Sequence, residues 1–255
     1  MSRESDARRT TLDHPDPDDP GRAEPAGPAP ARAAPGRPPL SRARVIRAAV
    51  EVADRNGLAG LSMRTVGREV GVEAMSLYSH VSSKADLLDA LADWIFEQVE
   101  LPGPDQPWRG AMRERASSAR RVLAQHPWAL GLIESRSSPG PALLRHHDTV
   151  LGSLRGDGFS VELASHAFSV IDAYVYGFVL TETSLPFPAE GSAEEFATGL
   201  TLPTELYPHL TELMTVLVVG GGYDFADEFE YGLDVILDEL QRRREATSEP
   251  PARPA

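Results

Sequence analysis

Residues 62–84, which read SMRTVGREVGVEAMSLYSHVSSK, carry side chains that could hydrogen-bond to DNA. Cationic and hydroxyl groups bind phosphate oxygens, and small or hydroxylated side chains fit against base edges in a major groove. The pattern alone is equally typical of an ordinary hairpin of two short helices. If it is a DNA-binding segment, we expect DNA contacts from Ser62, Arg64, Ala74, Met75, Ser76, Tyr78, His80 and Lys84.

A helix, a tight turn and a second helix would position these side chains. Ser62 is a good N-cap for the first helix, and Val66 and Val70 lie four residues apart on one face of it. Gly71 follows where a left-handed residue commonly ends a helix. In the second helix Leu77 and Val81 supply the buried side, so the polar residues between them face outward. The segment therefore predicts a helix-turn-helix.

Other chemistry is weakly supported. Adjacent His146 and His147 diverge by about 100° on a helix, so they cannot easily share a metal ion, and we expect them on a solvated face. The sequence has no Gly-x-Ser-x-Gly elbow, phosphate loop or dinucleotide fingerprint. It also has no cysteine, which excludes disulfides and thiol catalysis. We predict no metal, no cofactor and no enzymatic activity.

The remaining apolar spacing predicts an all-α protein. Ser41 caps a first helix over residues 42–56, which ends at Gly57 and completes a three-helix DNA-binding unit. Ser82 or Ser83 starts a connecting helix that runs to about Glu100. A loop is expected at residues 185–201. Body helices are expected over residues 108–125, 127–134, 141–155, 161–183, 204–219 and 224–244.

Charge is distributed unevenly along the 255 residues, whose net charge is −13. Residues 41–85 carry seven basic and four acidic groups, whereas residues 86–255 carry 12 basic and 27 acidic groups. Because screening limits charge effects to about 8 Å, the local excess matters most to DNA phosphates. The pattern favours a small DNA-reading module on an acidic body.

The two ends of the chain differ in composition from the part between them. Residues 1–39 hold nine of the 22 prolines and few large apolar side chains, which predicts a disordered extension. Arg32 and Arg37 could reach DNA from it, although the composition favours a passive tail. We divide the chain at 1–39, 40–85 (DNA binding), 86–244 (helical body) and 245–255 (flexible tail). With no apolar signal core and no run of about 18 apolar residues, we expect a cytoplasmic protein.

The amino-acid sequence of this segment resembles that of the tetracycline-repressor-like (TetR) family. The run Leu77-Tyr78-Ser79-His80-Val81, followed by Lys84, is similar to that family's recognition helix. The runs 48–57 and 61–64 also match, and the resemblance extends over residues 41 to about 99. It implies that Tyr78 and Lys84 contact phosphates, while Ala74, Met75, Ser76 and His80 face the groove.

The body resembles the family's C-terminal domain at residues 121–127, 140–141, 158–160 and 174–177. This resemblance implies a homodimer, formed by two long C-terminal helices, that binds a palindromic operator in double-stranded DNA and releases it when a small-molecule inducer binds. The resemblance places Glu100, Ile133, Ala173 and Thr181 at the positions of the family's drug–magnesium ligands, so tetracycline specificity does not transfer. The unknown inducer is expected against Trp94, Trp128, Phe168, Asp172 and Tyr176.

Two other functions remain open at this point. One is an all-helical small-molecule carrier or enzyme with a non-functional DNA-binding head. The other is a transcriptional activator or a regulator that needs no ligand. Operator binding that is lost on adding a compound would distinguish the repressor from the carrier.

Overall fold

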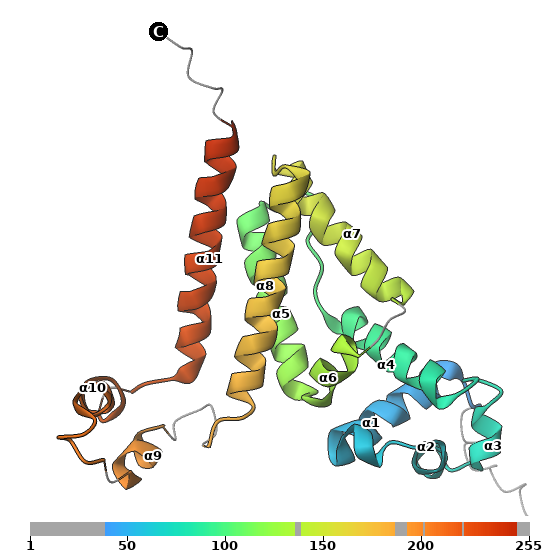
Figure 1. Cartoon of the computed structure of the whole chain (residues 1–255). Helices are drawn as coiled ribbons and strands as arrows, with labels where there is room; N and C mark the ends of the chain where they lie inside the picture. The colour runs from blue at the N-terminus through green and yellow to red at the C-terminus, as the bar shows by residue number, and fades with distance from the viewer. Residues whose placement is uncertain (1–38, 136–138, 187–192, 201, 221, 249–255) are drawn as a thin grey trace, which may run out of the picture. The chain divides into compact units, whose positions relative to one another are not determined.

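The computed structural model describes residues 39–135, 139–186, 193–200, 202–220 and 222–248, and every regular element in them is a helix (Figure 1). The predicted disordered extension, with Arg32 and Arg37, lies outside the described residues, as do residues 249–255 of the tail. The helices are α1 (Arg42–Gly60), α2 (Met63–Val70), α3 (Ala74–Leu77), α4 (Lys84–Gln98), α5 (Trp108–Gln125), α6 (Trp128–Glu134), α7 (Pro141–Gly156), α8 (Val161–Glu182), α9 (Ala193–Gly199), α10 (Pro208–Leu213), the π-helical turn η1 (Met214–Val218) and α11 (Phe225–Ser248).

Serine hydroxyls start three of the four N-terminal helices, as the sequence predicts. Ser41, Ser62 and Ser83 each accept a hydrogen bond from the backbone N–H three residues on, at the N-termini of α1, α2 and α4. Gly57 has φ 63° and kinks the chain at the predicted end of the first helix, after which α1 continues for one short turn. These local signals therefore fix where each helix begins and bends.

Two large apolar clusters form most of the core of the described residues. The N-terminal cluster includes Val45, Val66 and Leu77, and the body cluster is built mainly from α5, α7, α8 and α11. Helix α4 contributes Leu87 to the first cluster and Ile95 to the second. The described residues from Leu40 onward belong to one compact unit, in which α4 packs on both of these clusters.

The prediction for residues 185–201 is wrong in part, because α9 lies within them. Ala193 and Ala197 pack four residues apart against Val218 of η1. The negative charges of Glu194 and Glu195 in the first turn interact favourably with the positive end of the helix dipole. A single alanine pair is too weak a periodic signal to predict a helix from sequence.

The helix expected over residues 204–219 begins late and changes type. It starts at Pro208, since the residue before a proline avoids helical dihedrals, and Tyr207 has φ −132° and ψ 57°. From Met214 the helix widens into η1. The last helix, α11, extends four residues beyond its predicted end at 244, where Arg243 pairs with Glu239.

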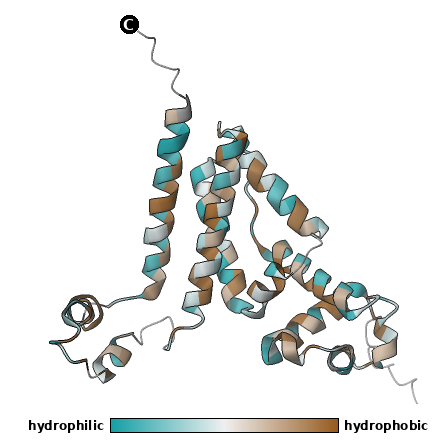
Figure 2. Ribbon diagram, viewed as in Figure 1, coloured by the Kyte–Doolittle hydropathy of each residue, from teal (hydrophilic) through white to brown (hydrophobic). Residues whose placement is uncertain are grey.

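Among the described helices, α8 is long and apolar enough to cross a membrane by length and composition. It nevertheless packs against α5, α7 and α11, as the core helix of a globular protein does. Figure 2 shows hydrophobic residues along α8 and along α11 beside it. Several large aliphatic or aromatic side chains of these two helices are exposed in the single chain, including Val170, Leu180, Tyr231 and Val235.

Candidate DNA-binding surface and ligand site

Helix α2 is fixed by a reciprocal cap and by close contact with the next helix. The Ser62 hydroxyl accepts from the Thr65 N–H at 3.1 Å, and the Thr65 hydroxyl accepts from the Ser62 N–H at 2.9 Å. A Cβ on Gly67 would lie 2.9 Å from the Val72 carbonyl oxygen and 3.3 Å from the Ala74 backbone. Glycine therefore allows the turn and α3 to approach α2 this closely.

The turn at Gly71 and the segment of residues 74–81 that follows it have the predicted geometry. Gly71 is left-handed with φ 72°, and Leu77 and Val81 are buried. Helix α3 has only four residues and continues as a turn through His80. Its outward side carries Met75, which is 77% exposed, with the predicted groove residue Ser76 also exposed.

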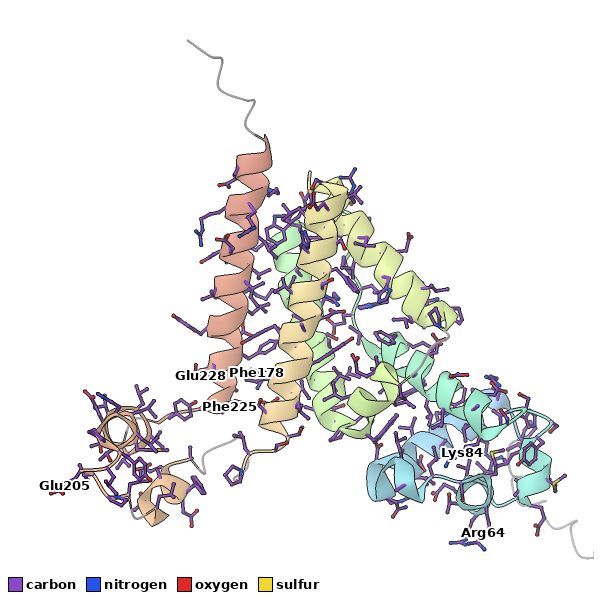
Figure 3. All side chains as sticks on the ribbon, in the orientation of Figure 1. Arg64, Lys84, Phe178, Glu205, Phe225 and Glu228 are labelled. Carbon is purple, nitrogen blue, oxygen red and sulfur yellow. The ribbon has the colours of Figure 1, made fainter. Side chains whose placement is uncertain are left out.

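The other predicted DNA contacts are distributed around this surface. Arg64 is exposed and points outward from α2 (Figure 3), and Lys84 is exposed at the first position of α4. Tyr78 is 45% exposed. Ala74 is half-buried against the N-terminal core, and His80 is half-buried while its carbonyl accepts from Arg42 Nη1 at 2.8 Å. The two half-buried residues therefore offer less free side-chain surface than the sequence pattern suggests.

This surface is held in place by an ion pair that the sequence pattern does not predict. Asp86 accepts from Arg42 Nη2 at 2.7 Å and from the Ser82 N–H at 2.7 Å, which ties the start of α1 to the turn after α3. These contacts, with the hydrogen bond from Arg42 contributing most and the Ser82 backbone N–H next, lower the pKa of Asp86 to about 2.

The Asp86 contacts give a pH-dependent prediction. Because the folded-state pKa is depressed, this stabilisation is present above the unfolded pKa near 4 and is lost as pH falls toward about 2. We expect Asp86→Asn to lower the melting temperature at pH 7 by a few degrees, and the difference from wild type to shrink between pH 4 and pH 2. Thermal unfolding at several pH values measures it, and a difference independent of pH would contradict the role.

Two carboxylates join the N-terminal helices to the body. Asp54 of α1 accepts from Trp128 Nε1 at 2.6 Å, and its Oδ1 lies 2.7 Å from His126 Nδ1. Asp93 of α4 accepts from the N–H groups of Ala142 and Leu143 at 2.8 and 3.1 Å. These N–H groups lie in the first turn of α7 and have no partner within that helix. Asp93 therefore caps a body helix although it lies on a different helix, α4.

The predicted ligand residues separate into two places. Trp94 and Trp128 lie at the junction just described, where each ring packs on His126. Phe168, Asp172 and Tyr176 recur every four residues on α8 and lie around Arg115 of α5. We call the second group the Arg115 cluster; it comprises Arg115, His146, His147, Phe168, Asp172 and Tyr176.

The prediction that His146 lies on a solvated face is wrong. His146 is 2% exposed, because the α7 face that carries it packs toward α5 and α8. Its Nε2 accepts from Arg115 Nε at 3.0 Å. Burial, together with the positive charge of Arg115, lowers the pKa of His146 to about 3. The imidazole is therefore neutral, and since Nε2 accepts, its proton is on Nδ1.

The rest of the cluster is aromatic or paired. Arg115 Nη2 donates to Asp172, and the guanidinium carbon lies 5.3 Å from the centre of the Phe168 ring. Burial raises the pKa of Tyr176, with the Asp172 carboxylate adding to the effect, and burial lowers the pKa of His147. No group of three or more metal-ligating side chains comes together within the part of the chain that the structure describes.

A third feature is an apolar groove on the surface formed by α8 and α11. Its volume is about 600 Å³. Near the other end of the two helices, Arg120 of α5 pairs with Glu182 of α8 and lies over the rings of Phe178 and Phe229. Phe178 also stacks on Phe225 of α11 at 4.9 Å (Figure 3). The groove is lined by Leu163, His166, Ser169, Val170, Val235, Ile236, Glu239, Leu240 and Arg243.

Comparisons with known proteins cover both the N-terminal helices and the C-terminal body. Residues 45–91 match the family described as bacterial regulatory proteins, tetR family, and residues 101–244 match the tetracyclin repressor-like C-terminal domain. The chain is 33% identical over 217 residues to the transcriptional repressor DrrR1 of Streptomyces coeruleorubidus, covering 79% of this chain and 77% of that protein. It is 31% identical to the class C tetracycline repressor of Escherichia coli, covering 82% and 94% of the two chains.

Solved structures give the same result. Apo ActR from Streptomyces coelicolor matches with a TM-score of 0.67 and 27% identity, covering 82% of this chain and 99% of that one. ActR in complex with actinorhodin matches with a TM-score of 0.64 and 28% identity, covering 81% and 99%. Of these relatives, DrrR1 is a transcriptional repressor and ActR is a TetR family protein.

Proposed function

The chain belongs to the TetR family of bacterial regulatory proteins, and from that premise we propose that it represses transcription as a homodimer whose operator affinity falls when a small molecule binds its body. The observation that supports this most directly is the exposed face of α3, held on α2 by Gly67 within the basic segment 41–85. We assign DNA binding to residues 40–85 and ligand binding and dimerisation to residues 86–244. The assigned role is regulation rather than catalysis, in the cytoplasm.

The DNA contacts divide by chemistry. Arg64, Tyr78 and Lys84 are exposed and suit phosphate oxygens, with the α2 N-terminus at Ser62 beside them. Met75 and Ser76 are the exposed residues of α3 and would meet base edges, with Ala74 and His80 flanking them. Positioning and base reading therefore fall on different side chains.

Two substitutions separate these roles. Lys84→Ala should weaken binding to all sequences similarly and reduce the salt slope by about one unit, because one phosphate contact is lost. Ser76→Ala should change base preference with little effect on the slope. Binding isotherms at several salt concentrations measure both, with Arg145→Ala on α7 as the control, an exposed arginine outside the basic segment. A normal slope with altered preference for Lys84→Ala would reverse the assignment.

Ligand control is supported by relatives and by the buried chemistry of the body. ActR has been crystallised with actinorhodin and with (S)-DNPA. In this chain the Arg115 cluster is the place where α5, α7 and α8 bring polar and aromatic groups together. Ile133 and Ala173, which resemblance places at magnesium-ligand positions, have side chains that cannot coordinate a metal. Release of the operator should therefore need no divalent cation.

Helix α4 is the proposed transmitter from ligand to DNA. It connects directly to the DNA-binding helices, and its Asp93 holds the N-terminus of α7 while Asp54 of α1 holds α6. A ligand that binds differently to two positions of α6 or α7 shifts α4 through these contacts, which changes the spacing of the two DNA-binding units. Coupling of about 1–3 kcal/mol would reduce operator affinity about 5- to 150-fold.

Selection of genomic fragments by the purified protein tests the function. We expect enrichment of a palindrome whose half-sites are about 34–36 Å apart. Compounds are then screened for release of that fragment, with and without a chelator. Failure to enrich any fragment would favour a carrier or enzyme, and activation of the adjacent promoter in a reporter assay would favour an activator.

A further inference from the structure

The Arg115 cluster contains two buried nitrogen atoms that have no hydrogen-bond partner among the described residues: Arg115 Nη1 and His146 Nδ1. Both residues are 2% exposed. A buried donor without a partner costs free energy comparable to a lost hydrogen bond, so such atoms need an explanation. Their presence together, inside the body of a ligand-responsive regulator, indicates that something outside the chain satisfies them.

The geometry defines both atoms as donors. Arg115 Nη1 can only donate, because a guanidinium has no acceptor. His146 Nδ1 carries the imidazole proton, because its Nε2 already accepts from Arg115 Nε at 3.0 Å. The missing partner must therefore supply acceptor atoms.

The charge of the cluster restricts that partner further. The positive charge of Arg115 is already matched by Asp172, and His146 is neutral. An anion placed here would leave a net negative charge in a poorly solvated site, which costs several kcal/mol in general. A ketone, quinone, lactone or amide oxygen accepts hydrogen bonds without adding charge.

The surrounding side chains indicate the rest of the ligand. The Phe96 ring lies 5.2 Å from that of His146, and the Phe168 ring meets His147 edge-on at 4.6 Å. Phe168, Asp172 and Tyr176 are only partly buried and form the more open side of the cluster. An apolar or aromatic frame fits these surroundings.

We propose that the inducer binds at the Arg115 cluster through an uncharged oxygen acceptor on an aromatic or otherwise apolar frame. This inference rests on the proposed function, because it names the ligand class of that same regulatory site. The inducer's oxygen accepts from Arg115 Nη1, from His146 Nδ1 or from both.

Three probes that share one tricyclic frame test the ligand class on the full-length protein without DNA. Fluorene has no acceptor, 9-fluorenone has a neutral ketone, and fluorene-9-carboxylate has an anion. We expect titration calorimetry to show 9-fluorenone binding about tenfold more tightly than fluorene and more tightly than the carboxylate. Tightest binding by the carboxylate, equal affinity for all three, or no binding of the ketone would overturn the proposal.

A matched pair of variants tests the donor. Arg115→Lys keeps a positive charge beside Asp172 but removes Nη1, so the preference for 9-fluorenone over fluorene should disappear. Arg120→Lys is the control, since Arg120 is on the same helix, is also paired with a carboxylate and has no unpartnered buried nitrogen. It should keep the tenfold preference. Equal preference in both variants would count against Arg115.

A measurement on the wild-type protein covers the case in which Arg115→Lys fails to fold. The ¹⁵N and ¹H resonances of the His146 ring should show a proton on Nδ1, shifted by 9-fluorenone and unmoved by fluorene. If neither compound moves the His146 ring resonances or the Arg115 Nη resonances, the ketone contacts neither donor and the proposal is overturned. Operator binding without any probe is measured separately: ketone binding without operator binding would refute only the repressor function, and the reverse would refute only the ligand class.

Discussion

The double variant Val170→Asp/Val235→Asp is expected to be a monomer at micromolar concentration and to lose at least about 100-fold in operator affinity. Val170 and Val235 line the groove between α8 and α11 and are 42% and 53% exposed in the single chain. Facing the same surface of a second copy, four carboxylates would oppose association. Each DNA-binding unit would then bind its half-site alone, without the effective concentration that linkage provides.

The two valines are already solvent-exposed in the chain, so the variant should keep its fold. Circular dichroism and the denaturant midpoint check this. Leu144→Asp/Leu151→Asp is the matched control, because those side chains are exposed on α7, away from the groove. Sedimentation velocity should show a dimer for wild type and control. A dimeric Val170→Asp/Val235→Asp variant would show that another surface pairs the subunits.

Gly67→Ala should destabilise the protein by about 1–3 kcal/mol and weaken operator binding by about tenfold or more. Alanine within a helix normally stabilises relative to glycine by about 1 kcal/mol, so the expected sign is reversed here. The reason is the 2.9 Å approach of the added Cβ to the Val72 carbonyl oxygen, a backbone atom that can move only with the turn. Moving the turn displaces α3 and its exposed face.

A second glycine shows whether this effect depends on contact. Gly152 lies within α7, and a Cβ added there would meet nothing within 4 Å. Gly152→Ala should leave stability unchanged or raise it by up to about 1 kcal/mol, with normal operator affinity. Chemical denaturation and operator titration measure both variants. Equal effects from the two substitutions would mean that the approach of α3 to α2 is not limited by Gly67.

Local signals in the sequence were sufficient for the N-terminal helices. Ser41, Ser62 and Gly71 act through atoms a few residues away, so their spacing predicts the caps and the turn. The all-α class followed from apolar periodicity. Helix α9 could not be predicted in the same way, because its two alanines are buried by packing against Val218, which comes about 20 residues later in the sequence.

The candidate ligand site was less predictable because it depends on packing between distant helices. Phe168, Asp172 and Tyr176 recur every four residues and so share one face of α8, and in the structure they form one side of the Arg115 cluster. Arg115 and His146 are 31 residues apart and looked like ordinary polar residues of amphipathic helices. Asp93 likewise gave no signal, since the helix end that it caps begins almost 50 residues later.

The capping of α7 by Asp93 has a consequence for how such a regulator can diversify. The carboxylate binds backbone N–H groups, whose positions do not depend on the side chains that α7 turns toward the body interior. Residues around Arg115 can therefore be exchanged for others that suit a new effector while the mechanical link to the reading helices is preserved. The selectivity for the inducer and the selectivity for the operator can therefore change independently, because the contact that connects the two sites depends on neither.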